Sequence, residues 1–385
     1  MRFVYLAMII FFVSLNLRPS ITSVGPLLDI IQTDLGMSGV TASLITTLPV
    51  FCMGLFAILA IRLNNLLGIE RSLLLAMLLI LIATFLRVFV NSSLFLLTTA
   101  LFSGVGIGIA GPLISGFIKK YFPEKPGLTG LYSVSMVTGA AIASSFSVQL
   151  FQKMNDSWQH SLSFWSILAV PASLLLLPLL KKGATNKDSI SISALFIKNK
   201  RVNLFILFFG CMAAIFYTVT AWLAPIVQST GLSYSQSGMI LTLFTVIQIP
   251  VSFLIPILVS KTGDRKTWLL VCSLSELIGI VLLLIHFSPW VTTIFLGIGA
   301  GGLFPLALLI PIEEASNTEE AISWSAMMLF GGYLLGSLGP AFIGLTVDLF
   351  DNFVPGLLVL VIIICMMLFT ILKIGNNKEN MDETK

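Results

Sequence analysis

Long apolar runs, separated by short polar stretches, fill almost the whole chain. A helix that crosses a bilayer needs about 20 consecutive, mostly apolar residues, and about twelve segments meet this requirement. We predict membrane-spanning helices over residues 4–31, 40–62, 72–90, 93–119, 127–152, 158–180, 202–228, 236–260, 268–287, 289–312, 321–348 and 353–373. The pattern therefore predicts an all-α polytopic membrane protein.

A single long polar stretch divides these helices into two sets. The lysine-rich segment 181–201 is polar, whereas the other connections are short. We therefore expect an N-terminal six-helix bundle over 1–180, a basic cytoplasmic linker over 181–201, a C-terminal six-helix bundle over 202–373 and a cytoplasmic tail over 374–385. The first apolar run follows Arg2 as a signal peptide would. It is too long and lacks a small-residue cleavage site, so we expect it to be retained as the first span.

The composition agrees with a bilayer environment. Of the 385 residues, 57% are hydrophobic and 10% are charged, whereas soluble domains carry roughly 25% charged residues. The four cysteines and the two histidines are widely separated, so we expect no metal site and no cofactor. The sequence contains no nucleotide-binding loop after a strand, no metal cluster and no catalytic triad. These observations argue against an enzyme, an ATP-driven pump and a nucleic-acid-binding protein.

The distribution of basic residues predicts the orientation in the membrane. With the N-terminus inside, 18 of the 21 lysine and arginine residues fall in cytoplasmic segments, and only Lys153 falls in an outer loop. Arg18 and Arg87 lie within predicted helices. Since basic loops remain on the cytoplasmic side, we expect a multi-pass protein with both termini in the cytoplasm.

A glycine pattern occurs once in each half. Residues 104–108 read GVGIG and residues 297–301 read GIGAG, an offset of 193 residues, and each run is followed by a proline at the same distance. Parallel repeats of this kind are typical of transporters built from two bundles. Because these runs lie in apolar helices, we interpret them as helix-packing positions rather than as a dinucleotide loop. The packing glycines are Gly104, Gly106, Gly108, Gly297, Gly299 and Gly301.

Three short motifs resemble a known transporter family. The GDRK sequence at 263–266 resembles the second-half copy of the cytoplasmic loop signature of the major facilitator superfamily, and GIER at 68–71 resembles a degenerate first-half copy. Within that superfamily, NLRPSITSVGPLL at 16–28 resembles the cyanate transporter and 2-nitroimidazole transporter family. The resemblance covers the full chain and implies the major facilitator fold in a bacterial cytoplasmic (inner) membrane. It also implies that Arg71, Asp264 and Arg265 belong to gating loops.

Arg18 is the most informative single residue. At 1.5 Å per residue it lies about 20 Å into the predicted first span, near the centre of a core about 30 Å thick. A charge at this depth costs about 2.5–3.5 kcal/mol, and arginine does not escape by losing its proton. Arg18 must therefore face water, an acid or a ligand. We expect it to bind the negative or electron-rich part of a substrate. The alternative is a permanent ion pair with an acid such as Glu276.

The residues around Arg18 predict a broken helix with one polar face. Pro19 has no N–H to donate to the carbonyl of Leu15, so the helix should kink there, and Gly25-Pro26 repeats this weakness. Helical spacing places a polar stripe on one side of the segment. The residues of this stripe are Ser14, Arg18, Thr22, Gly25 and Asp29.

Other polar residues within the spans complete the predicted site. The candidate substrate-binding residues are Arg18, Asn16, Thr22, Tyr132, Trp222 and Gln248. The candidate coupling or buried charges are Glu276, Arg87 and Asp29. A buried carboxylate such as Glu276 is a candidate proton carrier, whereas Arg87 lies close enough to a helix end to snorkel to the interface.

These features favour a secondary active transporter. We expect a monomer in the lipid bilayer that moves a small anion or a small polar heteroaromatic compound, cyanate-like or nitroimidazole-like, by alternating access. A proton is the candidate coupling ion. A multidrug–proton antiporter is the main alternative, but a cavity arginine repels cationic drugs. A passive channel or a receptor is a further alternative.

Overall fold

The computed structural model describes residues 2–37, 39–125, 128–182, 200–350 and 352–375, and this part of the chain is helical without strands. Within these residues, eleven helices are long and apolar enough to cross a membrane, or twelve if a bent pair is counted as one span. The predicted all-α polytopic fold is therefore confirmed. Most of the predicted linker 181–201 and of the tail 374–385 lies outside the described residues.

The chain forms two compact units, each treated separately below. Unit 1 comprises Met1–Lys198 and Ala315–Phe330, and unit 2 comprises Asn199–Glu314 and Gly331–Lys385. The sequence predicts instead that all of 202–373 forms one bundle. The predicted bundle boundaries stay a prediction. The grouping of Ala315–Phe330 with unit 1 follows from packing, because Ile322 fills the space beside Gly116.

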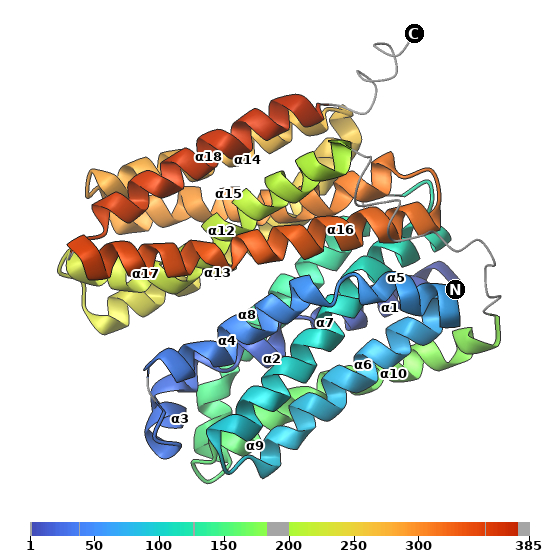
Figure 1. The fold of residues 1–385 in the computed structure, drawn as a ribbon, viewed down its shortest axis with the longest axis horizontal. Helices are drawn as coiled ribbons and strands as arrows, with labels where there is room; N and C mark the ends of the chain where they lie inside the picture. Colours follow the sequence, from blue (N-terminus) through green and yellow to red (C-terminus); the bar gives the residue numbers. More distant parts are fainter. Residues whose placement is uncertain (1, 38, 126–127, 183–199, 351, 376–385) are drawn as a thin grey trace. The chain divides into compact units, whose positions relative to one another are not determined.

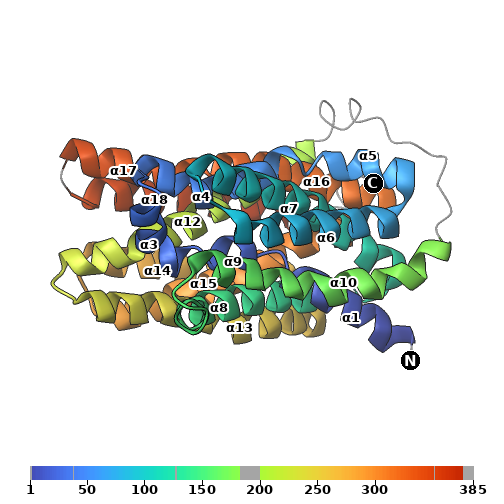
Figure 2. The ribbon, with the colours of Figure 1, turned by 90° about the horizontal axis from the view of Figure 1, so that it is seen from below.

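Unit 1 holds the helices of the first half, drawn from blue to green in Figure 1. Helix α7 packs against α4 and α6, and α1 packs against α8 and α10 (Figure 2). The elements of the first half are α1 (Arg2–Leu15), α2 (Pro19–Thr22), η1 (Gly25–Leu27), α3 (Leu28–Asp34), α4 (Gly39–Leu55), α5 (Leu59–Leu67), α6 (Ile69–Phe85), η2 (Leu86–Phe89), α7 (Ser93–Tyr121), α8 (Thr129–Lys153), α9 (Trp158–Phe164), η4 (Trp165–Leu168), α10 (Ala169–Leu176) and η5 (Leu177–Lys182).

Unit 2 is built around α15, which packs against α13 and α14. Helix α18 lies beside α14 and α12 (Figure 1). The elements of the second half are α12 (Lys200–Ser229), α13 (Tyr234–Thr262), α14 (Arg265–Leu284), α15 (Pro289–Glu314), α16 (Thr318–Gly336), α17 (Leu338–Phe350) and α18 (Val354–Ile374). Helix α16 begins in unit 1 and ends in unit 2.

The first span is broken where the prolines predict. Helix α1 ends at Leu15 and α2 begins at Pro19, and the segment at Gly25-Pro26 narrows into the 3-10 turn η1. In the first break, the N–H groups of Asn16 and Leu17 bond only three residues back, at 3.2 and 3.1 Å. The predicted kink is therefore confirmed, because a proline cannot continue the regular hydrogen-bond ladder.

Two other spans differ from the continuous helices that their apolar patterns suggest. Leu44–Leu55 and Leu59–Leu67 meet at 56°, where backbone bonds change to a three-residue spacing. The predicted span 321–348 divides at Ser337 into α16 and α17. Pro340 has no N–H for the carbonyl of Gly336, which explains the second break.

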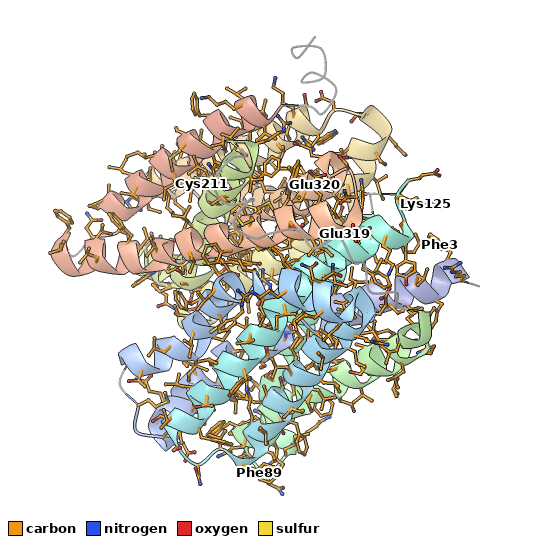
Figure 3. The ribbon with its side chains drawn as sticks, turned by 45° about the vertical axis from the view of Figure 1, so that its right-hand side comes forward. Phe3, Phe89, Lys125, Cys211, Glu319 and Glu320 are labelled. Carbon is orange, nitrogen blue, oxygen red and sulfur yellow. The ribbon has the colours of Figure 1, made fainter. Side chains whose placement is uncertain are left out.

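The ends of the unit 1 helices are fixed by specific contacts. Lys125 follows α7 and lies over the ring of Phe3 on α1, 4.8 Å from its centroid (Figure 3). Near the other end of the unit, the indole N–H of Trp158 donates to Asp34 at 2.8 Å. Trp158 belongs there to an apolar cluster with Val24, Leu27 and Ile31. These contacts hold the broken first span against its neighbours.

Candidate functional site

Arg18 lies in the first break of the broken span. It immediately precedes α2, has φ −120° and ψ −33°, and is 7% exposed. Its carbonyl accepts hydrogen bonds from the N–H groups of Ile21 and Thr22 at 2.9 and 3.0 Å. A permanently charged side chain therefore stands on the non-helical backbone between α1 and α2, in the middle of the span.

Side chains from neighbouring elements hold this break. The amide of Asn16 donates to the carbonyls of Phe12 and Leu168, at 2.7 and 2.8 Å. The hydroxyl of Thr22 lies 3.2 Å from the carbonyls of Arg18 and Ala140. Both N–H groups of Asn16 and the proton of Thr22 are thus occupied by backbone. In this conformation Asn16 and Thr22 hold the backbone of the break in place, and their donors are not directed to a ligand.

Close packing completes the joint. Gly139 of α8 lies against the carbonyl of Leu15, and a side chain at position 139 would collide with that oxygen. This carbonyl is the one that Pro19 leaves without a helical donor. The absence of a Cβ at Gly139 thus lets α8 cover the exposed backbone of the break, because small residues allow helices to approach closely.

Tyr132 is a buried polar residue that lies within the electrostatic influence of Arg18. It lies on α8 and is 3% exposed, and the charge of Arg18 acts electrostatically on its phenol. A Cβ on Gly111 of α7 would lie 3.6 Å from the Tyr132 hydroxyl oxygen. Tyr132 of α8 and Gly111 of α7 are therefore neighbours in unit 1.

The two remaining candidates lie in unit 2. The indole N–H of Trp222 donates to the carbonyl of Pro340 at 3.0 Å, and its ring lies 6.0 Å from that of Phe353. The amide of Gln248 donates to the carbonyl of Phe244, one turn earlier on α13, at 3.0 Å. The structure therefore joins neither residue to Arg18 within one unit, and their binding role stays a prediction.

The candidate buried charges have different surroundings. Glu276 on α14 is 1% exposed, and its Oε2 has no hydrogen-bond partner among the described residues. Its side chain fills the space beside Gly299. Arg87 on η2 is 0% exposed, so the snorkelling interpretation is wrong. The side chain of Asp29 lies outside the described part of the structure.

One ion cluster joins α6 to the end of α7. Glu70 accepts from Lys120 at 2.7 Å and from the hydroxyl of Tyr121 at 2.6 Å. The Glu70 side chain is 3% exposed, whereas that of Lys120 is 39% exposed. Arg71, the residue that the loop motif singled out, is exposed and takes part in no ion pair among the described residues.

A second ion cluster joins α14 to the end of α15. Arg265 is buried and binds Glu313 at 2.8 Å and Glu314 at 2.7 Å. Glu314 also pairs with Arg201 of α12. Arg265 and Arg201 donate to the carbonyls of Gly375 and Ile374, both at 3.2 Å. The cluster therefore holds together the ends of α12, α14, α15 and α18.

The second loop motif has a local role as well. Asp264 caps α14, because its carboxylate accepts from the N–H of Thr267 at 3.1 Å. Sequence reasoning identified Asp264 and Arg265 but missed their acidic partners and the pair of Glu70 with Lys120. The sequence does contain a signal for these ion pairs, because charged residues stand in the last turn of both α7 and α15. No metal-binding cluster of three or more ligating side chains occurs in the described ranges.

Comparison with known families places these features in context. A family model described as Major Facilitator Superfamily matches residues 4–340 and 204–380. The chain is 33% identical over 344 residues to the uncharacterized transporter YycB of Bacillus subtilis (strain 168), covering 88% of this chain and 85% of the relative. No activity follows from that name.

Two further relatives come from Escherichia coli (strain K12). The cyanate transport protein CynX is 28% identical over 350 residues, covering 90% of this chain and 91% of its own length. The 2-nitroimidazole transporter is 29% identical over 379 residues, covering 96% and 95%. Both similarities extend over most of the chain.

Solved structures share the fold at low sequence identity. A crystal structure of the transporter FucP in the outward conformation has a TM-score of 0.76 and 15% identity, covering 96% of this chain and 99% of that chain. The proton:xylose symporter XylE has a TM-score of 0.76 and 13% identity, covering 96% and 94%. At these identities the likeness establishes the fold alone.

Proposed function

Since the chain belongs to the Major Facilitator Superfamily, we propose that it is a secondary active transporter of a small anion or a small polar heteroaromatic compound. Transport proceeds by alternating access, and Arg18 binds the substrate. The chain works as a monomer in a bacterial cytoplasmic membrane. The proposal refines the family assignment in two respects, the substrate class and the binding residue.

The buried cation at a broken helix carries this proposal. Broken backbone at membrane depth occurs where it lines a cavity or packs on protein. Arg18 stands in the break, is buried, and its charge acts electrostatically on the phenol of Tyr132. A guanidinium offers five N–H donors in a planar fork, which suits a carboxylate, a cyanate or a nitro group. The phenol adds an aromatic face and a hydroxyl. This combination favours a planar, electron-rich ligand over a cationic drug.

The names of two relatives support the same substrate class. One is a cyanate transport protein and the other a 2-nitroimidazole transporter. A cyanate is a small linear anion, and a nitroimidazole is a planar ring with negative oxygen atoms. The feature that these compounds share is electron-rich oxygen or nitrogen that accepts hydrogen bonds. A fixed guanidinium recognises this feature in both.

Counterflow in liposomes tests the proposal. Purified protein is reconstituted, loaded with unlabelled cyanate or 2-nitroimidazole, and supplied with the labelled compound outside. A carrier accumulates label transiently, whereas a channel does not. Arg18→Ala should reduce this uptake by about 10- to 100-fold, since charged hydrogen bonds contribute about 1.5–3 kcal/mol. Arg18→Lys should retain part of the activity, because it keeps the charge but loses the fork.

Matched variants separate binding from folding. Arg62→Gln removes an exposed arginine from the same unit and should transport normally. If Arg18 only forms a structural ion pair, Arg18→Ala should instead lower the melting temperature, and removal of the acidic partner should restore both folding and transport. A well-folded Arg18→Ala protein with undiminished substrate affinity contradicts the proposal.

Glu276 is our candidate for proton coupling. It is an intramembrane carboxyl group with an unpartnered oxygen, and such groups mark proton relays in transporters. Glu276→Gln should leave counterflow unchanged, because exchange needs no net proton movement, and should abolish accumulation driven by a pH gradient. Equal accumulation by Glu276→Gln and by the unmodified protein excludes this role.

We also propose that both termini are cytoplasmic, on the asymmetry of the basic residues. A reporter enzyme that is active only in the periplasm, fused after Lys385, should be inactive. The same reporter inserted in the outer loop near Lys153 should be active and serves as the control. Activity of the C-terminal fusion contradicts this orientation.

A further inference from the structure

Arg87 is a fully buried cation whose hydrogen-bond donors are largely unused. Its side chain is 0% exposed, and its Nη1 donates to the carbonyl of Ser20 at 2.7 Å. Its Nε and Nη2 have no acceptor among the described residues. No described acid forms an ion pair with it. The neighbouring Phe89 is 63% exposed and lies at the edge of the molecule (Figure 3), whereas Arg87 is buried.

The single bond of Arg87 ties it to the broken first span. The carbonyl of Ser20 is available because the N–H of Val24 bonds to Ile21, three residues back, at 3.3 Å. Arg87 thus satisfies a carbonyl that the second break of the span releases. This bond uses one of the five N–H donors of the guanidinium. A hydrogen bond to one backbone carbonyl therefore does not explain why a whole charge is buried here.

Three buried hydroxyls near this bond also have no partner among the described residues. Thr84 stands three residues before Arg87, and Ser20 and Ser23 stand three residues apart on the first span. Residues three apart share a helix face, and the bond between Arg87 and Ser20 joins the two faces. The three hydroxyls are 0–2% exposed. The bond between Arg87 and Ser20 therefore joins two buried segments that carry these hydroxyls, and no acid among the described residues forms an ion pair with Arg87.

Such a set of groups has the chemistry of an anion site. A buried charge requires a counter-charge, because its desolvation is not otherwise compensated. The unsatisfied groups of Arg87, Thr84, Ser20 and Ser23 are N–H and O–H donors. An anion accepts hydrogen bonds from such donors, whereas a cation does not. The groups are fully buried, and because burying charge is costly, a monovalent ion is favoured over a phosphate.

We propose that Arg87, with the hydroxyls of Thr84, Ser20 and Ser23, forms a second site that binds a small monovalent anion. The site is distinct from Arg18 and does not depend on which compound the protein transports. The ion compensates the charge of Arg87 and links η2 to the broken first span. Its entry requires a local opening of that span, since the unused nitrogen atoms are covered in this conformation.

Thermal unfolding of the full-length protein in chloride-free detergent solution tests the site. Sodium chloride and sodium bromide are titrated against sodium gluconate at constant ionic strength, with gluconate as the large organic anion of the control. The unmodified protein should show a saturable rise in melting temperature, as expected for a ligand that binds only the folded state. Dialysis with radiolabelled chloride should give about one bound ion per chain, because Arg87 supplies one guanidinium to the site.

Variants assign this effect to Arg87. Arg87→Gln should abolish the halide-dependent rise, whereas Arg62→Gln, which removes an exposed arginine from the same unit, should retain it. Thr84→Val and Ser20→Ala leave the guanidinium in place and should each raise the half-saturating halide concentration about three- to tenfold. If Arg87→Gln does not fold, these two variants decide the question.

The same titration identifies the source of the anion. Stabilisation by both halides identifies a resident inorganic ion. Stabilisation by cyanate but not by chloride, lost in Arg87→Gln, also supports an anion at Arg87 and assigns it to the transported compound. The proposal is overturned if no small anion gives a saturable rise, or if the rise is equal in the unmodified protein and in the Arg87, Thr84 and Ser20 variants.

Discussion

The glycine runs of α7 and α15 occupy equivalent places in the two halves, but the helices around them differ in charge. Gly104 and Gly108 face α4, where an added Cβ would lie 2.6 Å from Pro49 Cα and 2.8 Å from Met53 O. Gly297 and Gly301 face α13 in the same way. The middle glycine of each run faces the next helix, Gly106 toward α6 and Gly299 toward α14.

The residue that meets the middle glycine differs between the halves. Ile80 lies against Gly106, whereas Glu276 lies against Gly299. Both side chains are buried, at 2% and 1% exposure. An apolar residue is therefore sufficient for packing at this position. Because the carboxyl group of Glu276 adds nothing that the packing requires, the comparison favours a functional role for it.

The ion clusters at the ends of these helices have opposite polarity. In the first half the acid Glu70 lies on α6 and the base Lys120 on α7. In the second half the base Arg265 lies on α14 and the acids Glu313 and Glu314 on α15. Both halves thus have an ion pair between the ends of two neighbouring helices. The helix that carries the acid and the helix that carries the base are exchanged between the halves. The second cluster is also more buried, so its loss should affect stability more.

The largest effect should come from the charge clusters. Arg265→Ala leaves Glu313 without its partner and Glu314 with Arg201 alone, and it should destabilise the protein by about 3–5 kcal/mol. Lys120→Ala should cost at most about 1 kcal/mol, because Lys120 is 39% exposed and Glu70 keeps Tyr121. Thermal unfolding in one detergent compares the two variants. Equal losses of melting temperature contradict the difference in burial.

A smaller effect is expected at the middle glycines. Gly106→Ala and Gly299→Ala place a methyl group 2.9 Å from Ala76 O and 2.8 Å from Cys272 O, and each should cost about 1–3 kcal/mol. Gly238→Ala on α13 meets nothing within 4 Å and should be neutral or slightly stabilising. Unfolding temperatures measure all three. A neutral Gly299→Ala protein contradicts the close approach of α14 and α15.

A still smaller effect on stability is expected from the helix cap, which is present in one loop motif and absent from the other. Asp264 caps α14 with its side chain, whereas Gly68 precedes α6 without a side-chain cap. Asp264→Ala should cost about 1 kcal/mol, and Asp264→Asn should retain most of the stability because asparagine also caps helices well. The difference in melting temperature between these variants isolates the cap. No difference between them would indicate that Asp264 stabilises the loop in another way.

The smallest effect on stability should follow from Glu276→Leu, which gives the second half an apolar residue like Ile80. Replacement of a buried, unpaired carboxyl group by an apolar side chain should be neutral or stabilising. Accumulation driven by a pH gradient should nevertheless be lost. A marked fall in melting temperature would instead assign Glu276 a structural role and remove the contrast with Ile80.

Much of the fold followed directly from the sequence. The apolar runs predicted the spans, because hydrocarbon accepts only long apolar segments with satisfied backbone groups. Pro19 and Gly25 predicted both breaks in the first span, since these residues act on the local hydrogen-bond ladder. The bend between α4 and α5 was not predicted. It arises where backbone bonds shift to a shorter spacing, and no proline lies within the break.

The site was only partly predictable. The sequence by itself determined that Arg18, Arg87 and Glu276 are charges within apolar segments, because depth in a span depends only on position along the chain. Tertiary structure decided which groups meet them. It brought the phenol of Tyr132 under the electrostatic influence of Arg18, tied Arg87 to the carbonyl of Ser20 and set Glu276 against Gly299. These partners come from different helices, and their proximity depends on helix rotation and packing, which the pattern of a single segment does not encode.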